Sequence, residues 1–154
     1  MKISLIDLSV VKNVQLLRKI IEKEMIKFAC NNLNDEIKLH LEKNIYMQKF
    51  YFEKSMFDEI IHLDNELHKY LFEISNNLLI YKNISKLYIH YDRIRTLEYK
   101  NKIHYKNTIK DHEDLYKAIL DCDADFAESI ISKHLDRLFE NIDTIQKKYP
   151  NYFV

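Results

Sequence analysis

Apolar residues recur along this chain at intervals of three and four from Val10 onward, which is the spacing of one face of an α-helix. The first stretch of this kind is carried by Val14, Leu17, Ile21, Met25 and Phe28. Asn31 and Asn32 interrupt the pattern, so we predict that a first helix ends there.

Five further helices are predicted from the same periodicity and from residues suited to helix ends. They cover about residues 34–54, 55–74, 78–99, 103–120 and 123–148. Asn34 and Asp123 are placed to act as N-caps, and Ser55 with Asp58 resembles a capping box for the third helix. Asn76 follows this third helix and can adopt the left-handed conformation that glycine usually provides at a C-cap.

Composition supports a helical fold. The chain has no Gly and a single Pro, Pro150, so it is poorly suited to tight hairpin turns or glycine loops that cradle phosphate. Hydrophobic residues make up 47% and charged residues 31%, as in a soluble globular protein. Amphipathic helices joined by short connections therefore predict an all-α fold, an antiparallel bundle of about six helices, in one domain over residues 1–154.

Charge and cysteine content narrow the function and location. Basic and acidic residues number 24 each, and this balance argues against nucleic-acid binding, which needs a concentrated cationic surface. Cys30 and Cys122 are far apart in sequence, as expected for free thiols in a reducing cytoplasm. No apolar run approaches the roughly 20 residues that span a bilayer. We therefore expect a cytoplasmic protein without a membrane partner.

Asp64 and His68 form the first candidate site. They are four residues apart on a predicted helix, so both project from one face and could ligate one ion. A surface pair worth a few tenths of a kcal/mol is the plain alternative. Leu63, Leu67 and Leu71 turn the neighbourhood toward the core, where a carboxylate costs several kcal/mol unless a charge such as a divalent cation compensates it.

His112 and His134 lie in the fifth and sixth predicted helices and are a weaker signal by themselves. Carboxylate and imidazole groups from several helices nevertheless build metal sites in bundle cores. Such a set of ligands suits Zn, Ni, Mn or Fe better than Ca or Mg.

A family resemblance joins these residues. The strings that carry it are Leu17 to Glu22 with Ala29, Asp64 to Leu71 with Ser75 to Asn77, His90 to Arg95, Asp111 to Asp123, and His134 with Leu135. Together they resemble the FCD domain, the effector-binding C-terminal domain of the FadR branch of GntR-type transcription regulators. The departures are Leu67 where Phe is usual, Asn76 and Cys122 where Gly is usual, and Asp111 where Glu is common.

The resemblance implies one divalent metal ion, Zn, Ni or similar, with a small carboxylate effector bound beside it. The implied metal ligands are Asp64, His68, His112 and His134. Candidates to pair with the effector are Arg18, Arg93 and Arg95, because guanidinium binds carboxylate in a fork geometry. Each arginine could instead form an ordinary ion pair.

We accordingly expect a homodimeric sensor that is not an enzyme. DNA would be bound only through a winged-helix domain, which the first dozen residues are too few to build. We therefore expect either one part of a longer regulator or a free-standing sensor domain. A mononuclear metal-dependent hydrolase and a plain interaction bundle remain alternatives. A di-iron oxidase is disfavoured because neither His112 nor His134 has a Glu three residues before it.

Overall fold

The computed structural model describes residues 4–101 and 105–154, and these residues confirm the all-α fold. Their helices are α1 (Leu8–Asn31), α2 (Asp35–Glu53), α3 (Phe57–Ile74), α4 (Leu78–Ile84), η1 (Ser85–Leu87), α5 (Ile89–Lys100), α6 (Tyr105–Leu120), α7 (Ala124–Glu140), α8 (Ile142–Lys148) and η2 (Pro150–Tyr152). No helix in this part of the chain is long and apolar enough to cross a membrane.

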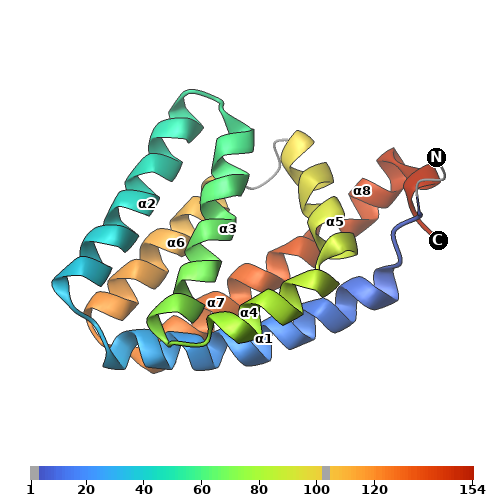
Figure 1. Cartoon of the computed structure of the whole chain (residues 1–154). Helices are drawn as coiled ribbons and strands as arrows, with labels where there is room; N and C mark the ends of the chain where they lie inside the picture. The colour runs from blue at the N-terminus through green and yellow to red at the C-terminus, as the bar shows by residue number, and fades with distance from the viewer. Residues whose placement is uncertain (1–3, 102–104) are drawn as a thin grey trace.

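The long helix α1 forms the base of the molecule, with α7 packed along it (Figure 1). Helices α2, α3 and α6 rise from one end of this base, and α5 and α8 lie toward the other end. The first and last described segments of the chain meet beyond α8, where Ile6 and Phe153 form a parallel β-bridge (Figure 1).

Helix starts largely follow the predicted caps. The side chain of Asn34 accepts a hydrogen bond from Ile37 N, and that of Asp123 accepts one from Phe126 N, so both predicted N-caps are confirmed. The capping box at Ser55 is wrong. Helix α3 begins at Phe57 without a side-chain cap, because Ser55 is used to end α2 instead.

Three turns place a non-glycine residue in the left-handed conformation. Ser55, Asn76 and Cys122 have φ values of 56°, 58° and 53°. After Asn76, for example, Asn77 N donates to Phe72 O at 2.8 Å, and Asn76 N itself donates to Glu73 O at 3.0 Å, which is the Schellman pattern of helix ends. The prediction that Asn76 replaces glycine at a C-cap is confirmed.

Two predicted helices are each divided in the structure. The helix expected over 78–99 is interrupted by η1, and Tyr88 and Tyr91 turn inward beside α1. The helix expected over 123–148 bends at Asn141, which has non-helical angles, so that Leu138 and Ile145 join the same apolar cluster. The predicted start of the fifth helix near residue 103 lies outside the described residues.

The core is divided into two main apolar clusters along α1. One cluster surrounds Met25 and Ala29 and includes residues of α2, α3, α6 and α7. The other surrounds Val11 and Val14 and includes residues of α5 and α8. Between these two parts of α1 lie Arg18 and Glu22, which are both buried. A polar layer therefore crosses the interior, and the candidate site lies within it.

Candidate metal centre

Asp64 and His68 lie on the inner face of α3, within the polar layer. Their residues are only 2% and 3% exposed, so the alternative of a surface ion pair is excluded. The flanking Leu67 and Leu71 are buried in the apolar cluster around Met25, as their helical spacing predicts. His68 Nε2 lies 3.2 Å from Asp64 Oδ1, so the two side chains meet one helical turn apart.

His112 of α6 and His134 of α7 bring two more imidazoles to the same point. His112 Nε2 lies 3.1 Å from Asp64 Oδ1 and 3.3 Å from His134 Nε2. His134 Nε2 in turn lies 3.1 Å from His68 Nε2. One ligand atom from each of the four residues falls within 4.8 Å of every other. All four residues that the resemblance implied as ligands thus converge, from three helices.

The other ring nitrogen of each imidazole faces an oxygen atom. His68 Nδ1 lies 2.5 Å from Glu22 Oε2, and His112 Nδ1 lies 2.8 Å from Gln48 Oε1. His134 Nδ1 faces Asp111 Oδ2 at the longer distance of 3.6 Å. A carboxylate or amide oxygen beside Nδ1 keeps the proton there, which leaves the Nε2 lone pair directed at the centre.

These supporting oxygens are themselves held in place. Gln48 Nε2 donates to Asn44 Oδ1 at 2.7 Å, and Asn44 Nδ2 donates to Leu63 O at 3.0 Å, which fixes the orientation of the Gln48 amide. Arg137 of α7 forms an ion pair with both carboxylate oxygens of Asp111. The imidazoles therefore have little freedom to turn their Nε2 atoms away.

This arrangement fits a divalent cation. Asp64 Oδ1 is buried and makes no hydrogen bond within the described part of the chain, although it faces the Nε2 atoms of His68 and His112. Converging lone pairs repel one another, and one proton can join only two of these atoms. One cation satisfies the carboxylate and all three imidazoles at once, and metal-bound histidines commonly have an oxygen acceptor on the second nitrogen.

The charges around the site favour the protonation states in which Asp64 and His134 can bind a cation. Burial disfavours the carboxylate of Asp64, but the charge of Arg95 and the neighbouring imidazoles of His112 and His68 hold its pKa well below the usual range. Burial, together with the charge of His112, lowers the pKa of His134 to about 4, so this ring is neutral near pH 7. Burial also opposes ionisation of Glu22, yet Arg18 and His68 lower the pKa of this carboxyl to about 2.

The candidate effector-binding arginines are placed differently from one another. Arg18 is buried, with Nε 2.6 Å from Glu22 Oε1 and its guanidinium carbon 4.9 Å from the ring centre of Tyr91. Arg95 forms an ion pair with Asp64 Oδ2 inside the molecule. Arg93 points elsewhere and binds the carbonyl oxygen of Ser4 near the chain's N-terminus. The structure thus brings Arg18 and Arg95 to the site and leaves Arg93 outside it.

Two small cavities adjoin the ligands. The first, of about 40 Å³, is lined by Asp64, His68, His134 and Arg137 among others. The second, of about 90 Å³, is lined by polar groups that include Asn65, Ser85 and Asp92. Arg18, His68 and Arg95 line both, so the two spaces are neighbours on either side of the arginines.

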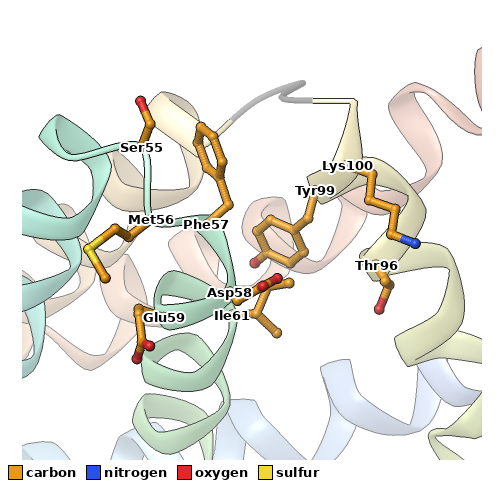
Figure 2. Close-up of a pocket in the computed structure, with 9 residues that line it drawn as sticks. All are labelled: Ser55, Met56, Phe57, Asp58, Glu59, Ile61, Thr96, Tyr99 and Lys100. Atoms are coloured by element: carbon orange, nitrogen blue, oxygen red, sulfur yellow. The ribbon is translucent and has the colours of Figure 1, made fainter.

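A larger hollow of about 420 Å³ opens between the start of α3 and the end of α5 (Figure 2). Phe57 and Ile61 lie on one side and Thr96, Tyr99 and Lys100 on the other. Tyr99 also lines the cavity beside the metal ligands, and its hydroxyl donates to Asp64 Oδ2 at 2.9 Å. Tyr99 therefore stands between the hollow and the centre.

The residues that support the histidines were not predicted from the sequence. Glu22, Gln48 and Asp111 are all buried, each on the inner face of its helix. Gln48 follows Leu41 and Ile45 at helical spacing, so a polar residue on an apolar stripe was the available signal. Which histidine each one contacts is determined only by the packing of α1, α2 and α6 around α3 and α7.

The comparisons with known proteins agree with one another. The profile of the FCD domain matches residues 14–137, which is most of the chain. The chain is similar to the HTH-type transcriptional repressor RspR of Escherichia coli K12, with 24% identity over 148 residues. It is also similar to an uncharacterized HTH-type regulator of Streptomyces ambofaciens, with 22% identity over 152 residues. These matches cover 96% and 98% of this chain but only 65% and 63% of the relatives, just under two thirds of their length.

Proposed function

This chain belongs to the FCD domain family of transcription regulators, and from that premise we propose that it senses a small organic acid through a divalent metal ion. The ion would be held by Asp64, His68, His112 and His134. The observation that carries the proposal is the convergence of three Nε2 atoms on the buried Asp64 Oδ1, which has no hydrogen bond among the described residues. To sense an effector, such a centre needs only a charge and a cavity shape that fit the acid, and no chemical step is required.

The donor set favours zinc, nickel or a similar ion. Three imidazole nitrogens and one carboxylate oxygen suit these metals, whereas calcium and magnesium prefer oxygen ligands. The bound ion would supply a fixed positive charge with room for a carboxylate oxygen of the effector. The protein's own part is to orient the imidazoles through Glu22, Gln48 and Asp111.

Arg18 is the best-placed arginine for the effector. Its ion pair with Glu22 uses Nε, and within the described residues no hydrogen bond of its Nη groups is seen, so these groups can meet an acid in the adjoining cavities. Arg95 already neutralises Asp64 and would contribute mainly its charge. Arg93 has no place in the effector site, because it binds Ser4.

Cavity size points to a small polar acid. A space of about 40 Å³ beside the ligands holds little more than a carboxylate group, so the rest of the effector would enter the polar space of about 90 Å³ beyond Arg18. Glu98 lines the smaller cavity, and burial raises its pKa to about 8. It is thus a neutral carboxyl near pH 7 and can donate a hydrogen bond to an effector oxygen.

The relatives favour regulation over the mononuclear hydrolase considered from the sequence. Their names describe a transcriptional repressor and a transcriptional regulator. A metal ion that binds a carboxylate can serve to recognise an effector as well as to catalyse hydrolysis. As partners we propose a second copy of the chain and, through a winged-helix domain outside residues 1–154, DNA in the cytoplasm. Exposed apolar side chains at Leu79, Leu87 and Ile89 support a contact between two copies.

A thermal-shift experiment tests the sensing function. A panel of small carboxylates is added to zinc-loaded and metal-free protein, and an effector at a hundred times its Kd should stabilise the loaded protein by roughly 2.7 kcal/mol. Arg18→Lys, which keeps the charge and loses the fork, should reduce this stabilisation, while Arg93→Lys should not. An equal shift in folded metal-free protein would contradict direct contact between metal and effector.

A further inference from the structure

Helix α5 contacts the metal centre with one of its faces. Arg95 binds Asp64 Oδ2, and Tyr99 donates its hydroxyl to the same oxygen at 2.9 Å. One turn earlier, the ring of Tyr91 lies against the guanidinium of Arg18. Tyr91, Arg95 and Tyr99 are spaced four apart, so they form a single stripe along the helix.

The opposite face of α5 holds the N-terminal segment of the described chain, residues 4–7. His90 Nδ1 accepts a hydrogen bond from Asp7 N at 3.3 Å, and Arg93 binds the carbonyl oxygen of Ser4. These two residues are three apart on α5 and lie on the same side. The same helix therefore contacts both the centre and this segment.

Residues 4–7 are also held by the start of α1, where Asp7 is the N-cap and accepts a hydrogen bond from Ser9 N at 2.8 Å, and by the C-terminal end of the chain. Ile6 N donates to Tyr152 O at 2.7 Å, and Val154 N donates to Ile6 O at 3.0 Å, which forms the short bridge between the chain ends. The buried side chain of Ile6 packs in the apolar cluster that also contains Ile94 of α5. A small displacement of α5 would thus act on the segment through Ile6 as well as through the two polar contacts.

The packing of α5 leaves room for such a displacement. The hollow of about 420 Å³ separates its last turn from the start of α3, with Thr96 and Lys100 facing it across from Asp58 (Figure 2). Close-packed interfaces resist movement, whereas an open space beside a helix permits it. At this end α5 is joined to α3 by the contacts of Arg95 and Tyr99 with Asp64 and by a hydrogen bond from Arg95 to Asn65. Tyr99 also lies in one apolar cluster with Ile60 of α3.

We propose that α5 couples the metal centre to residues 4–7, so that binding of a metal ion at Asp64 makes this segment more firmly held. An ion at Oδ1 fixes the carboxylate, and Oδ2 then holds Arg95 and Tyr99 in one position. Because α5 moves as one rigid helix, fixing Arg95 and Tyr99 also fixes the positions of His90 and Arg93. The inference rests on the proposed metal centre and adds the contacts through which metal occupancy changes how firmly residues 4–7 are held.

Hydrogen exchange followed by mass spectrometry tests this coupling, with zinc as the only added probe. The amides of Ile6, Asp7 and Val154 report the segment, because each makes one of the hydrogen bonds described above. A coupling free energy typical of linked sites corresponds to exchange slowed about 5-fold or more after zinc is added. Arg93→Ala should reduce this slowing, because it removes one of the contacts between α5 and the segment, while zinc uptake, measured separately, stays the same.

Lys100→Ala provides the matched control, because it removes a positive charge from α5 without touching either contact region. This variant should respond to zinc like the unaltered chain. Unchanged exchange of the three amides in protein that has taken up zinc would overturn the coupling and leave the proposed metal centre intact. Full slowing in Arg93→Ala would overturn it too. Failure of the unaltered chain to take up zinc would overturn the proposed centre, and the coupling with it.

Discussion

His68 Nδ1 lies 2.5 Å from Oε2 of Glu22, a residue 46 positions earlier in the chain. This contact joins α3 to α1 inside the polar layer, and Glu22 also holds Arg18 through its other oxygen. A single carboxylate thus orients a candidate metal ligand and a candidate effector ligand at once. The centre therefore depends on residues that would not touch the ion.

Glu22→Gln should weaken zinc binding by about 10- to 100-fold, the usual effect of removing an outer-shell partner of a metal-bound histidine. The amide keeps the shape of the side chain but loses the charge that orients His68 and balances Arg18. Competition with a chromogenic chelator measures the affinity. Glu24→Gln is the control, since Glu24 is an exposed residue of the same helix that pairs with Lys27. Equal affinity in both variants would show that Glu22 has no part in the centre.

Metal binding should release a proton from His68 in mildly acidic solution. Burial disfavours the imidazolium, but Glu22 and the neighbouring carboxylate of Asp64 outweigh this effect and raise the pKa of His68. Below that raised pKa the ring is charged and must lose its Nε2 proton to bind an ion, whereas above it no proton is released. Affinity should accordingly increase with pH through this range.

Calorimetry in two buffers of different ionisation enthalpy measures this proton release. At about pH 6, below the ordinary imidazole pKa, we expect zinc binding to release protons. The release should be smaller in Glu22→Gln, which lacks the charge that raises the pKa of His68. A zinc affinity that does not vary with pH would contradict a role for Nε2 of His68 as a ligand.

Cys122→Gly should stabilise the fold by about 1 kcal/mol, because Cys122 has a φ of 53° and a β-carbon makes this left-handed conformation costly. The residue is exposed, so the substitution loses little packing. Cys122→Ala keeps the β-carbon and should leave stability nearly unchanged. Denaturant unfolding of the three proteins measures the difference, and an alanine variant as stable as the glycine variant would disprove the backbone explanation.

Local sequence signals predicted most of the helices but could not predict where two of them divide. Ile84, Tyr88 and Tyr91 keep a helical spacing across η1, as do Leu138 and Ile145 across Asn141. The breaks are imposed by packing against the first turns of α1, which is tertiary information. Caps depend mainly on neighbouring residues, and this is why Asn34, Asn76 and Asp123 were predicted correctly. The capping box at Ser55 was wrong because that residue ends α2 instead.

The candidate site was predictable only in part for a similar reason. Asp64 and His68 were candidates from their helical spacing, and the family resemblance completed the set of four ligands that the structure brings together. The supporting oxygens depend on how the helices pack. Helical geometry could have separated the arginines, because residues two apart on a helix do not share a face. Arg95 and Arg93 accordingly point to the metal centre and to Ser4.

The metal content of the purified chain tests the central claim most directly. After exposure to zinc and removal of excess metal, elemental analysis should find about one ion per chain, as the single cluster of four ligands in the described residues requires. The His112→Ala, His134→Ala double variant should retain none, with circular dichroism confirming that it remains helical. A full equivalent of metal in the folded double variant, or none in the unaltered protein, would contradict the metal centre.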